Sequence, residues 1–446
     1  LITVDNGISS VKGVAAARDY GMKVLVTDHH LAGDTLPEAD AIVNPNQPGD
    51  RFPSKNLPGV GVIFYVMMGL RAHLREQGWF ATYAEPNLAQ LLDLVAMGTV
   101  ADVVPLDQNN RILVAQGLAR VRAGQARPGI QALIEIAKRD PDSLVASDFG
   151  FFVAPRINAA GRLEDMSLGI ECLLSDDMQQ ARALAKQLDE LNHQRRAIEA
   201  DMKQQALNLL DAMRLDDEQD GLPFGLCLFD ENWHEGVVGI LASRIKERLH
   251  RPVIAFASTA DGQIKGSARS VKGVHIRDVL DAIAARHPEL ISRFGGHAMA
   301  AGLSLPRQNY AAFVLAFDAE VRKHLDEDEL CGVLMTDGEL AQHELSLQVA
   351  ELIRHAGPWG QGFDEPLFDG RFEVLQRRIV GDNHLKLLLR PAGAEQVIDA
   401  IAFNTTDKDW PGEVTHVEAA YRLDVNAFRG QRSSQLVLHY VHPLTG

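Results

Sequence analysis

The sequence predicts an α/β protein that begins with a parallel sheet, continues through a long connecting helix into a second α/β domain, and ends in a small β barrel. Three observations predict this fold. Two apolar strands near the N-terminus flank a helix, and each strand ends in acidic residues. Residues 176–213 keep one helical stripe of apolar side chains, and residues 334–446 divide into about five short segments with β spacing.

The composition is that of an ordinary globular protein. The chain has 446 residues, of which 46% are hydrophobic and 23% are charged, and this length predicts two to four domains. No apolar run reaches the 18 or so residues of a membrane span, and no signal peptide is visible. The three cysteines, Cys172, Cys227 and Cys331, are too far apart for a zinc knuckle and too few for a disulfide framework. Free thiols of this kind fit the reducing cytoplasm.

Two further features of the whole chain bear on its function. The net charge of −16 gives no global signal for nucleic acid, so any such binding has to use local basic patches. The chain also begins at Leu1, inside a predicted strand and without a methionine. We therefore expect it to lack an N-terminal part of its first domain.

The first element is a β-α-β unit. Residues 1–4 form a strand that ends in Asp5, a helix follows to about residue 20, and residues 24–27 form a second strand. Three consecutive polar residues follow this second strand: Asp28, His29 and His30. Because ligands sit beyond the carboxyl ends of parallel strands, we expect these side chains to lie beside Asp5 at one sheet edge. Carboxylate and imidazole groups together suit a divalent transition metal such as manganese.

Residues 41–43 form a third strand, and an apolar helix opens at residues 58–61. The glycines at its start either permit close approach to the sheet or cradle a phosphate. The next helix runs from residue 88 and is expected to break at Gly98. Asp102 follows in an apolar surround, where it is either a helix cap or a metal ligand.

Three later segments are candidates for binding phosphate. Arg156 and Arg162 lie on a small-residue segment, where two guanidinium groups either bind phosphate or form an interdomain ion pair. In QIKGSARS, strand alternation puts Lys265, Ser267 and Arg269 on one face, as a phosphate cradle or as an exposed polar strand. The third segment offers backbone N–H groups and an imidazole to an anion, or is a structural turn: Gly295, Gly296 and His297.

The long helix divides the chain. At about 1.5 Å per residue it spans roughly 50 Å, which is typical of a connector. We expect a first domain over 1–175, the connector over 176–214, a second α/β domain over 215–330 and the barrel over 334–446.

The barrel predicted at the C-terminus is of the oligonucleotide-binding type. Basic residues exceed acidic ones along one stretch of it: Arg371, Arg377, Arg378, Lys386 and Arg390. Four aromatic residues could stack on bases, although each could equally belong to the barrel core: Phe372, Phe403, Tyr421 and Phe428.

Seven segments in this order give a specific resemblance: LITVDNGIS, VLVTDHH, GTVADVVPL, APRINAAGR, NWHEGVVGILASRIKER, KGSARS and GGHAMAAGL. With them the chain resembles the DHH phosphoesterase superfamily and, within it, the RecJ-type single-stranded-DNA 5′→3′ exonucleases. The resemblance covers nearly the whole chain. It implies a DHH domain, a DHH-associated (DHHA1) domain and an oligonucleotide-binding (OB) barrel in a cytoplasmic enzyme of DNA recombination and repair.

The resemblance also implies roles for single residues. Two manganese or magnesium ions would lie at the strand ends, with Asp5 bridging them and His29 and Asp102 binding one. Asp28 would orient the site, and His30 would contact the scissile phosphate. The DNA backbone or terminal phosphate would be held by Arg162, Ser267, Arg269 and His297, and the barrel would grip the strand. A helicase and a single-strand-binding protein are partners that the resemblance implies.

One family motif, an Asp-rich strand end upstream of LITVD, is absent from this sequence. Asp5, His29 and Asp102 are too few for two ions, so we expect this chain to bind metal poorly and to be nearly inactive. Two alternatives stay open. A DHH enzyme acting on short oligonucleotides or small phosphoesters would not need residues 334–446, and a silent single-strand-binding scaffold would not need the metal ligands. An unrelated α/β hydrolase or oxidoreductase has no support, because neither GxSxG nor GxGxxG after a strand occurs.

Overall fold

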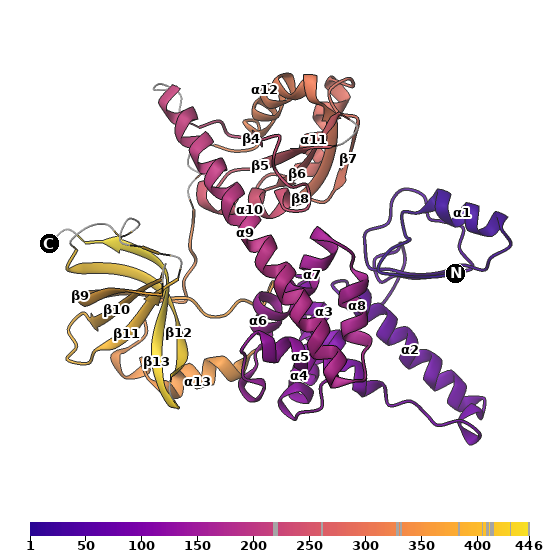
Figure 1. Ribbon diagram of the computed structural model, residues 1–446, viewed down its shortest axis with the longest axis horizontal. Coiled ribbons are helices and arrows are strands. Elements are labelled where there is room, and N and C mark those ends of the chain that lie inside the picture. The colour runs from indigo at the N-terminus through magenta and orange to yellow at the C-terminus, as the bar shows by residue number, and fades with distance from the viewer. Residues whose placement is uncertain are drawn as a thin grey trace. The chain divides into compact units, whose positions relative to one another are not determined.

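The computed structural model describes residues 1–216, 222–259, 262–326, 330, 332–381, 384–403, 405–406, 410, 414–428 and 430–444 (Figure 1). These residues divide into two compact units. The first unit contains residues 1–155, 172–185 and 334–446, and the second contains residues 156–171 and 186–333. None of the described helices is long and apolar enough to cross a membrane. Cys172 and Cys227 are free and buried, and Cys331 lies outside the described residues.

The first unit opens with the predicted parallel sheet, which is confirmed. Its order is β1-β2-β3, for strands β1 (Ile2–Val4), β2 (Leu25–Thr27) and β3 (Ala41–Val43). Val4, Thr27 and Val43 lie in register, so all three strands end at the same edge. Helix α1 (Val11–Asp19) connects β1 to β2 and packs Val14 against the buried valines of β2 and its lead-in.

A group of helices follows the sheet. They are α2 (Gly59–Glu76), α3 (Leu92–Ala101), α4 (Gln108–Arg122), α5 (Pro128–Ile136), α6 (Ala146–Asp148), α7 (Ala154–Leu163) and α8 (Ser167–Leu174). Short 3₁₀ turns lie between them at Trp79–Ala81, Leu88–Leu91 and Pro141–Ser143, and a π turn at Phe149–Val153.

The predicted break at Gly98 is wrong. Gly98 lies inside α3, where a Cβ would come within 2.8 Å of Val60, so this glycine allows α2 and α3 to pack closely.

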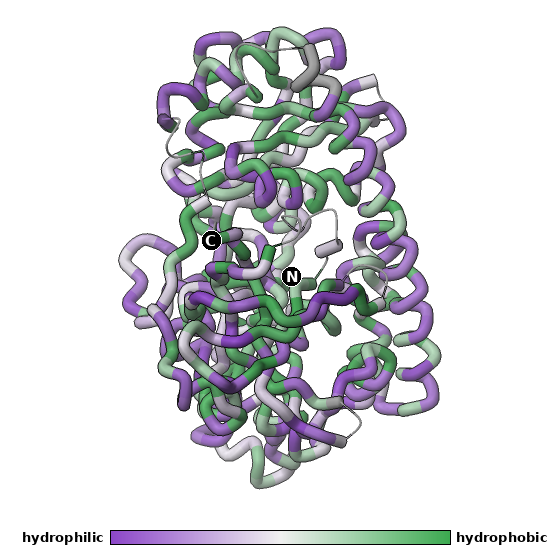
Figure 2. Tube along the Cα trace, turned by 90° about the vertical axis from the view of Figure 1, so that its left-hand side faces the viewer, coloured by the Kyte–Doolittle hydropathy of each residue, from purple (hydrophilic) through white to green (hydrophobic). Residues whose placement is uncertain are grey.

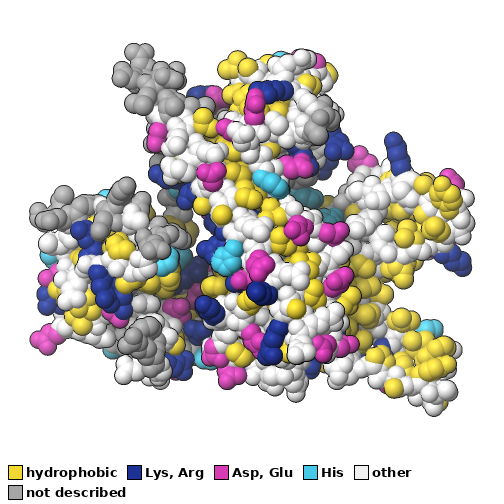
Figure 3. All heavy atoms as spheres, viewed as in Figure 1, with side chains coloured by type: hydrophobic (Ala, Val, Ile, Leu, Met, Phe, Trp, Pro, Cys, Tyr) yellow, Lys and Arg dark blue, Asp and Glu magenta, His cyan; other side chains and the backbone are white. Residues whose placement is uncertain are grey.

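The predicted long helix is confirmed as α9 (Met178–Asp216). Its first turns belong to the first unit, and the remainder belongs to the second. The predicted apolar stripe is buried at Leu184, Leu188, Leu191 and Met202. Acidic and basic side chains are interspersed over the exposed surface around α9 (Figure 3).

The second unit contains a five-stranded sheet in the order β4-β5-β6-β8-β7. Its elements are β4 (Leu226–Phe229), α10 (Val238–Leu249), β5 (Val253–Ser258), β6 (Gln263–Arg269), α11 (Ile276–Arg286), β7 (Arg293–Gly296), β8 (Ala300–Pro306), a 3₁₀ turn (Arg307–Asn309) and α12 (Tyr310–Val321). β4 and β5 pair in parallel, and the other pairs are antiparallel. Hydrophobic residues concentrate in the central strands (Figure 2).

The two faces of this sheet are covered unequally. Ile264, Leu303 and their neighbours pack on α11 and α12. On the opposite face, α9 and α10 cover β4 and β5, where Val253 and Ala255 are buried. On β6, β8 and β7 this same face includes the exposed residues Lys265, Gly302 and Gly295. The open part of the sheet is therefore limited to these three strands.

The C-terminal part of the first unit is a closed barrel, as predicted. It contains a 3₁₀ turn (Gln342–Glu344), α13 (Leu347–Ala356), β9 (Phe368–Val380), β10 (His384–Pro391), β11 (Ile398–Ala402), β12 (His416–Phe428) and β13 (Gln431–Pro443). The strands close in the order β10-β11-β13-β12-β9.

The barrel's aromatic and basic side chains can now be placed. Phe372 and Tyr421 are buried in the barrel core, whereas Phe403 is 51% exposed. The side chain of Phe428 lies outside the described residues. Three of the basic residues form ion pairs within the barrel: Arg371 with Glu418, Lys386 with Asp399, and Arg390 with Glu373. Phe403 is thus the better stacking candidate among the three aromatic side chains that are described.

Candidate functional site

Asp28 is a buried carboxylate at the end of β2, with 1% of its surface exposed. Its Oδ2 accepts a hydrogen bond from the Ile8 N–H at 2.9 Å. Its Oδ1 accepts from the N–H groups of His29 and His30, at 2.8 and 3.2 Å, and lies 2.7 Å from His30 Nδ1. Burial opposes ionisation, but these hydrogen bonds outweigh it and lower the pKa of Asp28. Asp28 therefore fixes the backbone and one imidazole of the segment that follows β2.

Two asparagines hold the same segment from the neighbouring strand, and the sequence did not single them out. Asn44 Nδ2 donates to the His30 carbonyl at 2.9 Å, and Asn46 Nδ2 donates to the His29 carbonyl at 2.6 Å. Both residues follow β3 at the edge where β2 ends. An amide placed just after an adjacent parallel strand is the only signal for this role in the sequence.

His29 faces two carboxylates that come from distant parts of the sequence. Its Nε2 lies 3.1 Å from Asp5 Oδ1 and 3.5 Å from Asp102 Oδ2. The nitrogen is buried and, among the residues that the structure describes, has no hydrogen-bond partner despite its short approach to Asp5. Burial disfavours the imidazolium, but the two carboxylates outweigh burial and raise the pKa of His29. Burial also raises the pKa of Asp102.

This arrangement fits a divalent cation. A buried imidazole nitrogen without a hydrogen bond, facing two carboxylates, has the donor set that manganese accepts. Within the described part of the chain, one group of three side chains can place its ligand atoms within 4.8 Å of one another: Asp5, His29 and His30. Asp102 does not belong to that compact group, although its carboxylate contacts the same His29 nitrogen. We favour Asp102 over His30 as a ligand, because His30 Nδ1 is already held by Asp28.

Asp102 follows the last residue of α3, so the cap and ligand alternatives can be compared. Its backbone N–H donates to the Gly98 carbonyl, which ends the helix. A carboxylate at a helix C-terminus is electrostatically unfavourable. The side chain therefore does not stabilise the helix end, and its position beside His29 favours a role as a ligand.

Close packing and an unusual backbone conformation fix Asp5. Asp5 has φ of 65°, in the left-handed region, and its N–H donates to the Thr27 carbonyl at 3.0 Å. Gly59, the first residue of α2, lies against its side chain, and a Cβ there would fall 2.2 Å from Asp5 Oδ1. Of the two roles considered for the glycines at the start of α2, close approach is the one observed at Gly59.

The predicted phosphate-binding residues all lie in the second unit, where they differ in surroundings. Arg156 Nε donates to Asp189 Oδ1 of α9 at 2.8 Å, and both side chains are largely buried. This contact makes Arg156 part of an ion pair, but one within the second unit rather than between two units. Arg162, on α7, instead donates to the Gly236 carbonyl at 3.1 Å, just before α10. Burial and the positive charge of Arg162 lower the pKa of Arg269. The two cations therefore lie close together.

Ser267 and Arg269 project from the same face of β6 as Lys265, where the first turn of α10 partly covers them. Arg269 Nη1 donates to Ser267 Oγ at 3.0 Å. Gly239 in the first turn of α10 packs against both, because a Cβ there would lie 2.9 Å from each of the two side chains. The first turn of α10 and the two arginines together form a site that favours anions. Gly236 and Gly239 belong to the segment NWHEGVVGILASRIKER, and nothing in the sequence reveals that they lie beside Arg162 and Arg269.

Gly295, Gly296 and His297 belong to the β7–β8 hairpin. The His297 N–H donates to the Ala300 carbonyl at 2.8 Å. Gly296 has φ of 149°, and a Cβ would collide with the facing strand at 2.4 Å, so this glycine serves the turn. Gly295 has open space around it and pairs with Gly302, which pairs with Ser267. Exposed backbone thus extends from Ser267 across the sheet through Gly302 and then Gly295. We name these two glycines the glycine row.

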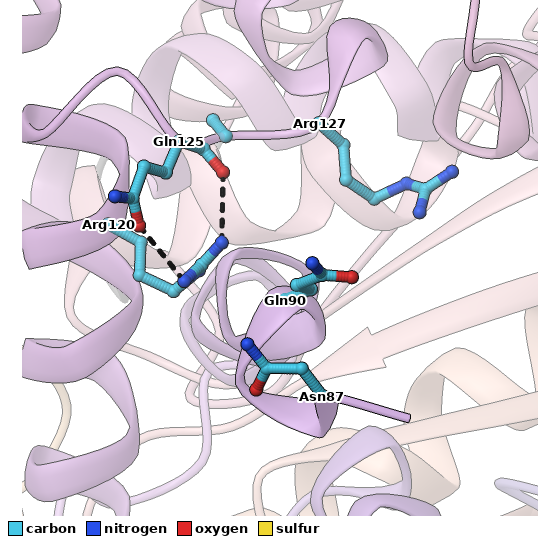
Figure 4. Close-up of a pocket in the computed structure, with 6 residues that line it drawn as sticks. Asn87, Gln90, Arg120, Gln125 and Arg127 are labelled. Carbon is cyan, nitrogen blue, oxygen red and sulfur yellow. Dashed lines mark hydrogen bonds between the residues drawn. The ribbon is translucent and has the colours of Figure 1, made fainter. Parts of the chain in front are cut away.

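A separate pocket of about 450 Å³ lies among the helices of the first unit (Figure 4). It is lined by Asn87, Gln90, Arg120, Gln125, Ala126 and Arg127. Arg120 donates to the side chain and carbonyl of Gln125, and Arg127 donates to the carbonyls of Leu173 and Leu174. These guanidinium groups are engaged within the chain, and the pocket contains none of the predicted site residues.

Comparison with known proteins places the three parts in known families. Residues 1–99 match the DHH family N-terminal domain, residues 223–323 match the DHHA1 domain, and residues 336–440 match the RecJ OB domain. The fold class predicted from the sequence is confirmed by these matches and by the solved structures described next.

The similarity to individual relatives extends along the whole chain. It is 58% identical over 447 residues to the single-stranded-DNA-specific exonuclease RecJ of Dickeya dadantii and 54% identical to that of Escherichia coli, covering 100% of this chain and 77% of each relative. The crystal structure of Thermus thermophilus RecJ with Mn²⁺ matches 100% of this chain and 62% of its own, with a TM-score of 0.81 and 30% identity. The same enzyme with Mg²⁺ matches with a TM-score of 0.74 and 27% identity. The chain therefore belongs to the RecJ family of single-stranded-DNA-specific exonucleases.

Proposed function

We propose that this chain hydrolyses phosphodiester bonds of single-stranded DNA from the 5′ end, with a divalent cation held at the strand ends of the first sheet. The observation that carries the proposal is the buried His29 Nε2, which faces Asp5 and Asp102 without a hydrogen bond of its own. This donor set is suited to Mn²⁺ or Mg²⁺, and RecJ structures contain both ions.

The site residues of the first unit each have a role in this proposal. Asp5, His29 and Asp102 would hold the metal, which supplies a water-derived nucleophile and offsets charge on the phosphoryl oxygens. Asp28 orients His30 through Nδ1, and we assign His30 to the scissile phosphate. Asn44 and Asn46 keep the backbone of this segment in place through the two histidine carbonyls.

The second unit supplies the contacts to the DNA backbone. Arg162, Ser267 and Arg269 bind phosphate oxygens through charge-assisted hydrogen bonds. The exposed glycine row beside Ser267 admits the sugar–phosphate chain without steric hindrance. We propose that His297 and the backbone of Gly295 and Gly296 take the neighbouring phosphate.

The proposal also assigns a role to each part of the chain. The DHH domain (1–175) carries the metal, the helix over 176–214 connects, the DHHA1 domain (215–330) binds phosphates and the barrel (334–446) holds the single strand. A helicase and a single-strand-binding protein are the proposed protein partners, on the strength of the family resemblance alone. We place the activity in the cytoplasm, where bacterial DNA is repaired.

The test is the release of nucleotides from single-stranded DNA labelled at the 5′ or the 3′ end, with and without Mn²⁺. We expect slow metal-dependent release that starts from the 5′ label, because Asp5, His29 and Asp102 are few ligands for two ions, and a further loss of release in the His29→Ala variant. A preference for substrates of two to five nucleotides would instead favour an oligonucleotide phosphoesterase. Binding of single strands without any hydrolysis would favour a silent scaffold.

A further inference from the structure

The loop that carries Asp102, residues 102–107 between α3 and α4, has an unfavourable backbone conformation. Val103 has φ of 59°, in the left-handed region. A β-branched side chain is rarely found there, because its Cβ crowds the backbone. Such a conformation persists only where the surrounding structure holds it in place. The contacts of this loop therefore decide where the Asp102 carboxylate lies.

Helix α4 and the loop before α2 hold one side of this loop. The buried Asn110 donates from Nδ2 to the Pro105 carbonyl at 3.0 Å and to the Asn56 carbonyl at 2.7 Å. Ser54 Oγ donates to Asp107 Oδ2 at 2.7 Å. Asn110 follows the loop closely in the sequence, whereas Ser54 and Asn56 come from the segment before α2.

A turn far along the chain holds the other side of the loop. Leu106 in the loop and Gln361 in this turn are about 255 residues apart in the sequence. We name residues 359–363, between α13 and β9, the docking turn. The Leu106 N–H donates to the Gln361 carbonyl at 2.7 Å. A Cβ on Gly360 would lie 2.7 Å from Leu106, and one on Gly362 would lie 3.4 Å from Pro105. The docking turn therefore lies directly against the loop that begins at Asp102.

The docking turn is itself rigid and tied to the barrel. Gly360 and Phe363 exchange two backbone hydrogen bonds of 3.0 Å, and Gly362 has φ of 68°. Trp359 stacks on Phe363 with ring centres 4.9 Å apart and donates from Nε1 to the Ile353 carbonyl of α13 at 2.9 Å. The turn thus moves with the helix that packs on the barrel.

A cation–π contact fixes the turn to α4. The Arg111 guanidinium lies 4.0 Å from the centre of the Phe363 ring. Arg111 Nε is buried and makes no hydrogen bond within the described structure. Contacts of this kind are stronger when desolvated. The turn is therefore attached both to the loop and to the helix that begins after it.

We propose that the docking turn is a positioning element for Asp102, through which the barrel portion of the chain sets the affinity of the metal site. This inference rests on the proposed function, because it takes Asp102 as a metal ligand. Residues that orient metal ligands from behind typically change metal affinity 10–100-fold when they are altered. Loss of the turn should therefore weaken metal binding even though none of its residues is a proposed ligand.

The experiment measures the dissociation constant for Mn²⁺ by isothermal titration calorimetry and by the electron paramagnetic resonance signal of free Mn²⁺. In the full chain, Phe363→Ala should raise this constant about tenfold. Phe363→Tyr keeps the ring over Arg111 and should bind Mn²⁺ like the parent. Excess Mn²⁺ should return the nuclease rate of Phe363→Ala to near the parental value, which a general loss of folded protein would not allow.

A matched pair of glycines keeps the test valid if Phe363→Ala folds poorly. Gly362 and Gly393 both have positive φ, but only Gly362 contacts the Asp102 loop, while a Cβ on Gly393 meets nothing within 4 Å. Replacement by alanine strains both turns equally. We expect Gly362→Ala to weaken Mn²⁺ binding and Gly393→Ala to leave it unchanged.

The outcomes separate this inference from the proposed function. If the parent binds Mn²⁺ and Asp102→Asn weakens binding, while Phe363→Ala and Gly362→Ala bind like the parent, the positioning role is refuted and the metal site stands. If the parent binds no Mn²⁺, or Asp102→Asn binds like the parent, the assignment of Asp102 fails and the inference fails with it.

Discussion

The acidic strand ends of the first unit and the basic sheet face of the second unit are the proposed sites for opposite charges, and they are built on different kinds of backbone. The proposed metal ligands come from places where regular structure stops: Asp5 has positive φ, and Asp102 is followed by Val103, which also has positive φ. Ser267, Arg269 and the glycine row lie on regular strands with continuous pairing. A small ion needs ligands that converge on one point, whereas an extended polymer needs a repeating surface.

The largest effect should follow from removing a metal ligand. Asp5→Ala or His29→Ala should lower the rate of DNA hydrolysis on the order of 1,000-fold, since a metal contributes several kcal/mol to transition-state stabilisation. Mn²⁺ affinity should fall in parallel, and DNA binding should stay within about twofold of the parent. Asp34→Ala, an exposed acid in the loop after the same strand, is the matched control. Parental Mn²⁺ affinity in His29→Ala would show that the cluster is not the metal site.

The relative effects of Asp102 and His30 sharpen the assignment within the first unit. Asp102→Asn should weaken Mn²⁺ binding more than tenfold, because it removes a charged ligand. His30→Asn should slow hydrolysis about 100-fold at saturating Mn²⁺ while binding the ion nearly as well as the parent. Calorimetry and single-turnover rates measure the two quantities. The reverse pattern would make His30 the ligand, in agreement with the compact group of Asp5, His29 and His30.

The corresponding change in the second unit should affect DNA and spare the metal. Arg269→Ala removes a charged hydrogen-bond donor worth about 1.5–3 kcal/mol, so the KM for single-stranded DNA should rise about 10–100-fold. Mn²⁺ affinity should not change. Arg277→Ala, at an exposed position on α11, controls for the loss of one positive charge. If Arg269→Ala altered Mn²⁺ affinity and left KM unchanged, the division between the two regions would be wrong.

Two glycines on neighbouring strands test whether the sheet face is functional or only structural. Gly302→Val adds a side chain over the open face and should weaken DNA binding about fivefold without lowering Tm. Gly266→Ala on the opposite face would put a Cβ 2.5 Å from Phe256, so it should lower the free energy of unfolding by about 1–3 kcal/mol. Fluorescence anisotropy and calorimetry separate the two effects. Equal DNA binding by Gly302→Val and the parent would argue against the glycine row as a binding surface.

The smallest effect concerns the pH dependence of stability in the second unit. Burial raises the pKa of Glu320, but hydrogen bonds from Lys323 and Arg286 outweigh it and lower that pKa below its ordinary value of 4.5. Because the folded pKa is depressed, the stabilisation is present above pH 4.5 and is lost as the pH falls through the folded value. Glu320→Gln should therefore lower Tm by about 2 °C at pH 7 and by less at pH 3. A constant difference across this range would exclude ionisation as its cause.

Strand-end chemistry made much of the metal cluster predictable. Asp5, Asp28, His29 and His30 follow short apolar strands that are visible in the sequence, and parallel pairing brings the ends of these strands together. Asp102 lies far along the chain, and only the family resemblance selected the ligand role over the helix cap. Asn44 and Asn46 were missed because their role depends on which distant carbonyls the loop after β3 reaches, which no local pattern encodes.

Periodicity was a reliable guide to elements and a weaker guide to their ends and contacts. The long helix and the barrel were predicted because their apolar spacing repeats many times. Gly98 was expected to break a helix because glycine lowers helix propensity. In the structure the gain from close packing against Val60 outweighs that propensity. The burial of Phe372 and Tyr421 could not be predicted either, since an aromatic residue on a strand suits a core as well as a ligand.

The glycine row has a consequence for selectivity. Side chains distinguish bases by presenting hydrogen-bond donors and acceptors to the base edges. Gly295 and Gly302 have no side chains, so they cannot distinguish one base from another in this way. On the proposed function, a single strand that moves across this surface would meet the same energy at every nucleotide. Digestion should therefore proceed at an even pace through any sequence, and homopolymers and mixed sequences of equal length should disappear together.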